Sequence, residues 1–298
     1  MAKSKSPGDL IMDILICAFF ALFSLVCLFP FYYIIINTIS DNNLVARGRV
    51  LFYPIGVHFN NYLEVFQLKG FGRAALISVA RTVSGAGLGV LSASFLGYAM
   101  TKQEYWHRKF WYRFFIVTMY FNAGLIPYYL TINNLHLRNN FLVYILPSLA
   151  APFNMILVKT YIESIPPALE ESAEMDGAGY LARYQKIILP LSKPILATIA
   201  IFAAVGQWNS FMDTVMFANK SSLYTLQFIM YKYLNELNQL AQLIRQNPSY
   251  ASAAAQIQLT PVAVRFTVTA VVVMPVLLIY PFFQRYFVKG IMIGAVKG

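Results

Sequence analysis

The sequence predicts an all-α membrane protein with six transmembrane helices, and two observations support this fold class. Of its 298 residues, 58% are hydrophobic and only 12% are charged, whereas a soluble domain has about 25% charged residues. In addition, six stretches reach the roughly 20 mostly apolar residues that a helix needs to cross a bilayer core. The composition therefore predicts a chain that lies mainly within a membrane.

The six spans are assigned by length and apolar character, with ends that are approximate. They lie at about 11–38, 73–100, 111–132, 141–162, 192–217 and 262–287. The third contains Asn122 and Pro127, but the aromatic and aliphatic residues around them still favour a span. The first is too long for the apolar region of a cleavable signal, and no small-residue cleavage site follows Pro30.

The distribution of positive charge predicts that both termini lie in the cytoplasm. Thirteen Lys and Arg residues then fall on the cytoplasmic side: Lys3, Lys5, Lys102, Arg108, Lys109, Arg113, Lys159, Arg183, Lys186, Lys193, Arg285, Lys289 and Lys297. Seven fall on the outer side: Arg47, Arg49, Lys69, Arg138, Lys220, Lys232 and Arg245. This asymmetry follows the positive-inside rule. The net charge of +11 is dispersed among apolar spans, which argues against nucleic acid as a partner.

The second span carries small residues at intervals of four, namely Gly85, Gly89, Ala93 and Gly97. A stripe of small residues lets another helix approach closely within a membrane. We therefore expect this span to be packed tightly against a neighbour.

The sequence offers no catalytic or metal site. The three histidines are scattered outside the spans without the spacing of metal ligands, and no Ser-His-Asp or His-Cys arrangement is present. Cys17 and Cys27 lie on one predicted helix, too far apart for a disulfide. The chain also lacks the Gly-x4-Gly-Lys-Ser/Thr loop that cradles phosphates, so any ATP and Mg would be bound by a partner.

The connection between the fourth and fifth spans predicts a bent pair of short helices. Pro167 suits a first helical turn, and Glu170, Glu171 and Glu174 oppose the positive end of the helix dipole. Gly177 should end this helix, because glycine adopts the left-handed conformation of a C-terminal turn.

A second short helix should follow the turn. It would carry Leu181, Tyr184, Ile187 and Ile188 on one face, and Pro190 would stop it. The expected product is a rigid helix-turn-helix plate on the cytoplasmic surface.

This connection resembles the signature loop of binding-protein-dependent ABC importer permeases: Glu-Ala-Ala, two residues, Asp-Gly-Ala, and later Ile-x-Leu-Pro. The matching residues are Glu171, Ala173, Asp176, Gly177, Ala178, Tyr184, Ile187, Leu189 and Pro190. Ser172 replaces the central alanine, a change between small residues. The resemblance implies a type I ABC importer permease fold, in which this loop, with Glu170, is the coupling helix that docks in a groove of the ATPase.

The resemblance extends over roughly 70–298. The segment from Trp208 to Phe211 resembles the tryptophan-asparagine motif of sugar-importer permeases. The tail at 280–298 resembles that of the carbohydrate-uptake, maltose-type permeases, and within them the subgroup for polysaccharide fragments that include uronates. The implied function is import of oligosaccharides.

The resemblance also implies an assembly and a location. The partners would be a second homologous permease, an ATPase dimer that binds ATP and Mg, and an external solute-binding protein docked on the outer loops, including 218–261. The location would be the bacterial cytoplasmic (inner) membrane. We expect three parts: an N-terminal span and outer loop at 1–70, the transmembrane domain at 71–290 with the coupling loop at 165–190, and a tail at 291–298.

Three charged residues, Arg81, Asp213 and Arg265, fall in the outer halves of predicted spans. Charges within hydrocarbon cost on the order of 3 kcal/mol, so they indicate ion pairs or pathways. Asp213 could pair with one arginine, or an unpaired arginine could face the translocation path and favour acidic sugars. The other candidate path residues are Gln207, Trp208 and Asn209, because polar groups in a span need a polar partner.

Two alternatives remain from the sequence. A permease of the same superfamily for peptides or metals would share the coupling loop. An ion-driven secondary transporter would need carboxylates near mid-membrane, and Asp13 and Asp213, both near span ends, supply them poorly.

Overall fold

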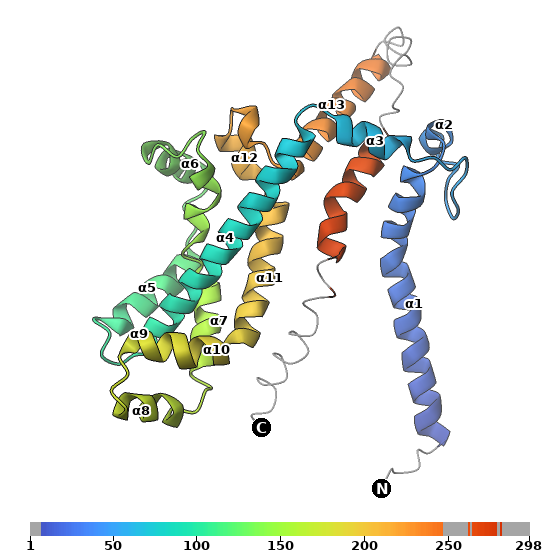
Figure 1. The fold of residues 1–298 in the computed structure, drawn as a ribbon. Helices are drawn as coiled ribbons and strands as arrows, with labels where there is room; N and C mark the ends of the chain where they lie inside the picture. Colours follow the sequence, from blue (N-terminus) through green and yellow to red (C-terminus); the bar gives the residue numbers. More distant parts are fainter. Residues whose placement is uncertain (1–6, 247–261, 263, 279–280, 282–298) are drawn as a thin grey trace. The chain divides into compact units, whose positions relative to one another are not determined.

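The structure, a computed structural model, describes residues 7–246, 262, 264–278 and 281, and in these residues all regular secondary structure is helical (Figure 1). The chain divides into two compact units. Unit 1 comprises Met1–Lys69 and Lys232–Met274, and unit 2 comprises Gly70–Tyr231 and Pro275–Gly298.

The helices follow one another in chain order. They are α1 (Pro7–Thr38), α2 (Asn42–Ala46), α3 (Asn60–Gln67), α4 (Phe71–Ala99), α5 (Arg108–Tyr120), α6 (Leu125–Asn134), η1 (Phe141–Tyr144), η2 (Leu146–Ser148), α7 (Pro152–Ile162), α8 (Ala168–Met175), α9 (Tyr180–Arg183), η3 (Tyr184–Ile188), α10 (Leu189–Leu191), α11 (Lys193–Asn209), α12 (Met212–Phe217), η4 (Ser221–Leu223) and α13 (Leu226–Gln246). A further apolar helix covers Val264–Leu278.

Two predicted spans are single long helices, a third contains a bend, and another bend precedes the fifth. Both α1 and α4 are long and apolar enough to cross a membrane. Phe141–Ser148 and Pro152–Ile162 form a pair bent by 45°, and Tyr180–Leu191 and Lys193–Asn209 form a pair bent by 78°. By length and composition, the described residues thus contain two spans, or up to four if each bent pair is one span.

The spans expected at 111–132 and 192–217 each contain a break between two helices. The first is divided into α5 and α6 at 121–124, where the Asn122 side chain accepts a hydrogen bond from the Gly124 backbone N–H over 2.8 Å and Gly124 has a φ of +84°. Asparagine side chains favour such turns over helix, and Pro127 lacks the N–H that would continue a helix across the break. The second is broken between Asn209 and Met212.

Unit 1 contains a small core at the end of α1. Ile36, Val45 and Val50 are buried there against Val262 and Phe266. The outer loop expected within 1–70 is folded here into α2 and α3, and α13 covers part of the outer connection expected at 218–261. Residues 247–261 of that connection lie outside the described residues.

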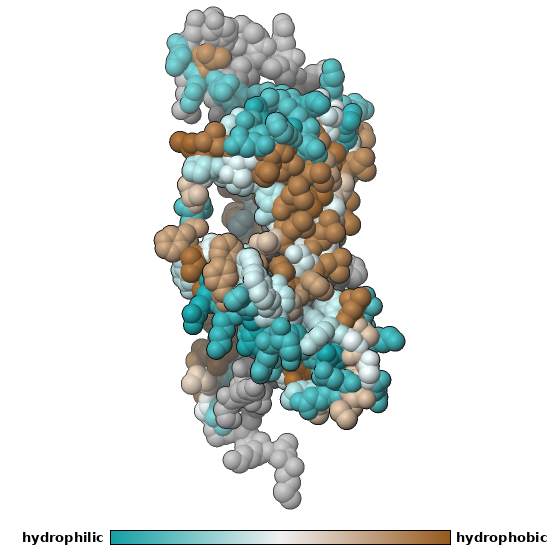
Figure 2. Space-filling model, turned by 90° about the vertical axis from the view of Figure 1, so that its left-hand side faces the viewer, coloured by the Kyte–Doolittle hydropathy of each residue, from teal (hydrophilic) through white to brown (hydrophobic). Residues whose placement is uncertain are grey.

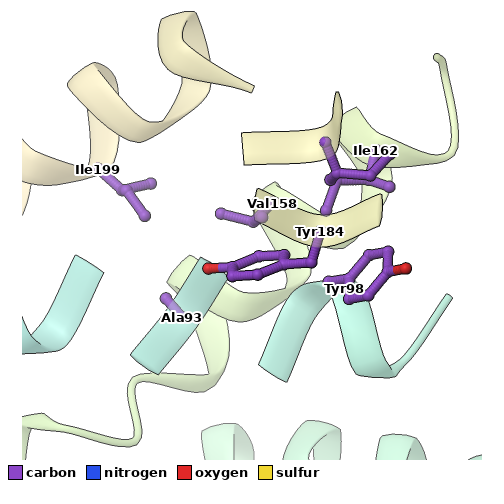
Figure 3. Close-up of a cluster of buried hydrophobic side chains, with 7 residues drawn as sticks. Ala93, Tyr98, Val158, Ile162, Tyr184 and Ile199 are labelled. Carbon is purple, nitrogen blue, oxygen red and sulfur yellow. The ribbon is translucent and has the colours of Figure 1, made fainter. Parts of the chain in front are cut away.

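Unit 2 is organised around α4, which packs against α7 and α11. Its main core cluster is shown in Figure 3 and consists of Ala93, Tyr98, Val158, Ile162, Tyr184, Ile188 and Ile199. Tyr184 lies between the ring of Tyr98 and the small side chain of Ala93 (Figure 3), and its hydroxyl hydrogen-bonds Ser94 Oγ at 3.0 Å.

The small-residue stripe of α4 provides the predicted close approach. A Cβ atom added to Gly97 would lie 3.1 Å from two backbone atoms of α7, Lys159 N and Met155 O. A Cβ atom added to Gly85 would lie 2.7 Å from the Gln207 side chain of α11. The absence of side chains at these positions therefore lets α4 contact both neighbours.

Hydrophobic side chains are exposed on the outside of the helices, as expected for a protein embedded in lipid. In α4, Leu76, Val83 and Phe95 are each about half exposed or more. Figure 2 shows hydrophobic side chains across the middle of one face, with hydrophilic ones above and below them.

We predict that Gly97→Ala destabilises the α4–α7 contact. The added Cβ would meet α7 backbone, which cannot rotate away as a side chain can, so we expect a loss of about 1–3 kcal/mol. Gly87→Ala is the matched control, because nothing lies within 4 Å of a Cβ at Gly87. Denaturation of the purified complex measures both variants, and equal stability of the two would contradict the prediction.

Candidate functional site

The acidic helix α8 ends in a glycine turn, as the sequence predicts. Gly177 has a φ of +83°, its N–H donates to Glu174 O over 2.9 Å, and the Ala178 N–H donates to Ala173 O over 2.9 Å. These two bonds define a Schellman motif, which satisfies carbonyls at a helix end. The bend that follows α8 is therefore fixed by backbone hydrogen bonds.

The second helix of the plate differs from the prediction in two respects. Pro190 does not stop it, because a wide π-helical turn at 184–188 precedes the proline and the helix continues to Leu191. A π turn shifts the hydrogen-bonding register, which accommodates the missing N–H of proline. Leu181 is exposed and not on the buried face, whereas Tyr184 and Ile188 are buried in the core cluster.

Glu170 attaches α8 to the end of α4. Its carboxylate accepts a hydrogen bond from the Tyr98 hydroxyl over 2.8 Å and forms an ion pair with Lys102. The Lys102 ammonium also lies over the Tyr98 ring, 4.5 Å from its centroid. One carboxylate of the plate thus binds two side chains at the same end of the long helix.

Glu170 remains ionised because its partners outweigh its burial. Burial raises the pKa of this carboxyl, but hydrogen bonds from Lys102 and Tyr98, with the charges of Lys102 and Arg183, lower it more, and the net pKa lies below its ordinary value. A lowered pKa contributes stability above the unfolded pKa of about 4.3, and this stability is lost as the pH falls through the folded value. The attachment is therefore intact at neutral pH.

Arg183 joins the two helices of the plate. Its Nη1 donates to Glu174 Oε2 over 2.7 Å, and its guanidinium lies 4.4 Å from the Tyr180 ring centroid. The Arg183 side chain is almost fully buried. Because a buried charge without a partner is costly, this contact fixes α8 against α9.

The remaining predicted coupling residues are placed around this attachment. Glu171, Asp176, Gly177 and Pro190 are exposed, whereas Ala173, Ala178 and Leu189 are half-buried. Met175 next to them is 87% exposed. The plate therefore has an inner side that contacts α4 and an exposed outer side that carries acidic and apolar groups.

A second cluster surrounds Arg81, which is buried in the first half of α4. Its Nη2 donates to Asp213 Oδ2 over 2.6 Å, its Nε donates to Gln207 Oε1 over 2.8 Å, and its Nη1 donates to Ser210 O over 3.1 Å. The guanidinium also lies 4.5 Å from the Tyr144 ring centroid. Of the two sequence-based alternatives, the structure shows the ion pair between Asp213 and Arg81.

The same cluster accounts for the break between α11 and α12. Ser210 is extended, so its carbonyl leaves the helical hydrogen-bonding pattern and accepts from Arg81 instead. Irregular backbone within a membrane is tolerated only where protein groups or a cavity satisfy it. Arg81 therefore stabilises the break directly.

A cavity of about 340 Å³ adjoins this cluster. Its lining comes from α4, from 147–154 and from α11–α12: Arg81, Gly85, Gly89, Pro147, Ser148, Ala150, Ala151, Asn154, Phe202, Ala203, Gly206, Gln207, Ser210 and Asp213. Within the described chain, the Asn154 amide has no hydrogen-bond partner in unit 2, and Asp213 uses only one carboxylate oxygen. The cavity therefore presents free polar groups in an otherwise apolar bundle.

The five predicted path residues are not all at this cavity. Arg81, Gln207 and Asp213 line it, whereas Trp208 is buried elsewhere and Asn209 is exposed and accepts a hydrogen bond from Gln227 Nε2 over 3.1 Å. Arg265, in unit 1, is exposed.

Sequence reasoning missed several residues of both sites. Ser148 and Asn154 could have been found, because each is a polar residue inside a predicted span. Tyr98 and Lys102 carried no such signal, since their partner Glu170 lies far away in the sequence. Across the described residues, no group of three or more His, Cys, Asp or Glu side chains could hold a metal ion.

A match to a known protein family shows the class of the protein. The family described as "Binding-protein-dependent transport system inner membrane component" matches residues 85–293, and the chain belongs to this family. It is thus a multi-pass permease component of an ABC importer and not a catalytic subunit. Membership of this family also means that the chain is not an ion-driven secondary transporter.

Two curated relatives resemble the chain over nearly its whole length. It is 30% identical to the polygalacturonan/rhamnogalacturonan transport system permease protein YtcP of Bacillus subtilis (strain 168), covering 97% of this chain and 99% of that protein. It is 32% identical to protein LplC of the same organism, covering 92% and 90%.

A solved structure is similar as well. A chain in the crystal structure of a bacterial ABC transporter involved in the import of the acidic polysaccharide alginate is 31% identical, with a TM-score of 0.83, and the match covers 96% of this chain and 100% of that one.

We predict that Glu170 and Lys102 are energetically coupled. Lys102→Met and Glu170→Gln should each reduce the local stability of α8 by about 1.5–3 kcal/mol, because hydrogen bonds to charged groups are lost. The double variant should lose less than the sum, since the second change removes no further pair. Hydrogen exchange of the α8 amides in the assembled complex measures this local stability.

The control is the more exposed pair Lys159–Glu163, an i,i+4 contact of 2.7 Å. Pairs of this kind contribute only about 0.3–0.5 kcal/mol. Strict additivity of the Lys102 and Glu170 variants would show that the two side chains do not act together.

Proposed function

We propose that this chain transmits ATP-driven motion from an ATPase dimer to its own helices through the plate at 165–190, which faces the cytoplasm together with both termini. The assembly further contains a second homologous permease and an external solute-binding protein, which docks on the outer loops, including 218–261. ATP and Mg are held by the ATPase and not by this chain.

The observation that carries this proposal is the two-sided plate. Its inner side is attached to α4 through Glu170, Tyr98 and Lys102, so displacement of α8 is passed to a span and not absorbed by a loop. Its outer side exposes Glu171 and Met175, a combination of charge and apolar surface that suits docking into a groove of another protein. The fixed turn at Gly177 keeps the plate rigid.

We predict that Glu171→Lys uncouples the complex. A lysine at this position would repel the positively charged partner surface that a docked glutamate would contact. Transport and transport-stimulated ATP hydrolysis should therefore fall at least about tenfold. Glu163→Lys is the control, since Glu163 is also exposed but lies before α8. Normal transport and ATP hydrolysis in Glu171→Lys would overturn the proposed role of the plate.

The proposed substrate class is oligosaccharides that contain uronates. Support comes from the relatives, whose names concern polygalacturonan and rhamnogalacturonan, and from the alginate importer. The cavity beside Arg81 is the proposed part of the path in this chain, because Asn154 and Asp213 offer polar groups to sugar hydroxyls. Its volume of about 340 Å³ is at the small end of the range for ligand pockets, so it would hold one end of a chain.

Arg81 is not the group that selects acidic sugars in this proposal. Its charge is neutralised by Asp213 and its three donor nitrogens are occupied. Arg81 instead keeps α11 and α12 in position beside the cavity.

We predict that the reconstituted importer, with its binding protein, takes up oligogalacturonides faster than their neutral methyl esters. Arg81→Ala should reduce the uptake of both by a similar factor, because it removes a structural contact. Radiolabelled uptake into proteoliposomes measures all four rates. Equal wild-type rates would contradict the acidic substrate class, and a selective loss of oligogalacturonide uptake in Arg81→Ala would contradict the structural role.

A further inference from the structure

A large basic pocket lies at the start of α5, away from both sites described above. Its volume is about 730 Å³, and its lining includes Gln103, Tyr105, Arg108, Lys109 and Arg113. Figure 1 shows that the turn before α5 lies at the end of unit 2 that also carries α8, α9 and α10. In the proposed orientation, this end faces the cytoplasm.

The basic residues of the pocket are not held in ion pairs within the described part of unit 2, and the acid nearest to them in the sequence, Glu104, lines the adjoining pocket. Among the described residues of this unit, Arg108, Lys109 and Arg113 form no ion pair with a carboxylate, and the one side-chain hydrogen bond in the group runs from Arg108 Nη1 to Thr101 O over 2.9 Å. The nearby carboxylate of Glu170 is already paired with Lys102. Three cations within six residues repel one another, so the pocket is suited to an anion.

An apolar surface continues from the pocket along α5. Phe110, Phe114 and Val117 are 60%, 48% and 50% exposed, and their spacing of four and three places them on one helical face. Phe110 also lines the basic pocket itself, and its ring stacks on Phe114 with centroids 6.5 Å apart. The basic pocket is thus continuous with an apolar surface, as the charged headgroup of a lipid is with its hydrocarbon chain.

We propose that this pocket binds an acidic phospholipid, with the phosphate at Lys109 and Arg113 and an acyl chain along Phe110, Phe114 and Val117. A small soluble anion would bind the basic side chains but would not cover the apolar face of Phe110, Phe114 and Val117. An acidic peptide would also leave this apolar face exposed. Basic pockets beside membrane helices recognise anionic lipid headgroups through the same combination of features.

The site also adjoins the attachment of the coupling plate. Tyr105 lines both the basic pocket and a neighbouring apolar pocket of about 450 Å³, and the latter is also lined by Tyr98 and Lys102. These are the two residues that bind Glu170. A lipid bound at 103–113 therefore lies one side chain away from the contact that attaches α8 to α4.

The test is the retention of phosphatidylglycerol by the purified complex. The assembled importer is placed in nanodiscs of phosphatidylcholine with phosphatidylglycerol, and its co-purifying lipids are counted by native mass spectrometry. The wild type should retain phosphatidylglycerol in preference to phosphatidylcholine, and the K109Q/R113Q variant should retain about tenfold less of it, because each removed cation weakens the attraction to an anionic headgroup. Arg108 stays in place to preserve its contact with Thr101.

The matched control is K186Q/K193Q, which removes two exposed cations from unit 2 outside the pocket. This variant should retain phosphatidylglycerol as the wild type does. An equal loss of phosphatidylglycerol in both double variants would show that only the net charge of the protein matters, and it would overturn the proposal. Unchanged retention in K109Q/R113Q would overturn it as well. Displacement of the lipid by millimolar inorganic phosphate would show an anion site without lipid recognition and would also overturn it.

A second measurement needs no variant. A photoreactive phosphatidylglycerol should cross-link the wild-type chain within 103–117, and cross-linking only at other segments would contradict the site. Sugar-stimulated ATP hydrolysis in the same samples tests the proposed importer function separately, because the lipid readouts do not depend on turnover.

Discussion

The close contact of α4 with α7 and α11 is the constraint on which the rest of unit 2 depends. Within a bilayer, lipid tails are as apolar as leucine side chains, so helices associate through van der Waals packing and polar contacts. Gly85 and Gly97 remove side chains where the neighbours approach. This contact also brings Arg81 beside Gln207 and places Tyr98 next to Tyr184, so both polar clusters depend on it.

The broken and bent helices follow from the need to satisfy backbone groups without water. Each unsatisfied backbone group in hydrocarbon costs several kcal/mol. At Ser210 the freed carbonyl is bonded by Arg81, and at 121–124 the turn is closed by Asn122. The bundle thus gains cavities and bends at places where a side chain replaces a lost helical hydrogen bond.

The sequence predicted the features that depend on local chemistry. Hydropathy located α1 and α4, the left-handed glycine turn was predicted at Gly177, and the cost of a charge in hydrocarbon suggested a partner for Arg81. In each case, the relevant energy is set by a few residues close together in the chain or by the membrane itself.

The features that the sequence did not predict depend on contacts between distant segments. The break at 210–211 requires the guanidinium of a residue more than a hundred positions earlier, and hydropathy remains high across it. The π turn before Pro190 lies where Tyr184 and Ile188 are buried in the core cluster with residues of α4 and α7, and periodicity alone favoured a regular helix there. Likewise, no pattern in the residues around Glu170 predicts its contacts with Tyr98 and Lys102.

The position of α4 in both clusters has a geometric consequence. Arg81 and Tyr98 lie on one uninterrupted helix, separated by about 25 Å at the helical rise per residue. Over that length, a tilt of only a few degrees displaces one end relative to the other by roughly 1–2 Å, about half the length of a hydrogen bond. A small tilt of α4 as a rigid body is enough to break or remake contacts at its far end. Motion at the coupling plate can therefore reach the cavity without a series of small rearrangements in between.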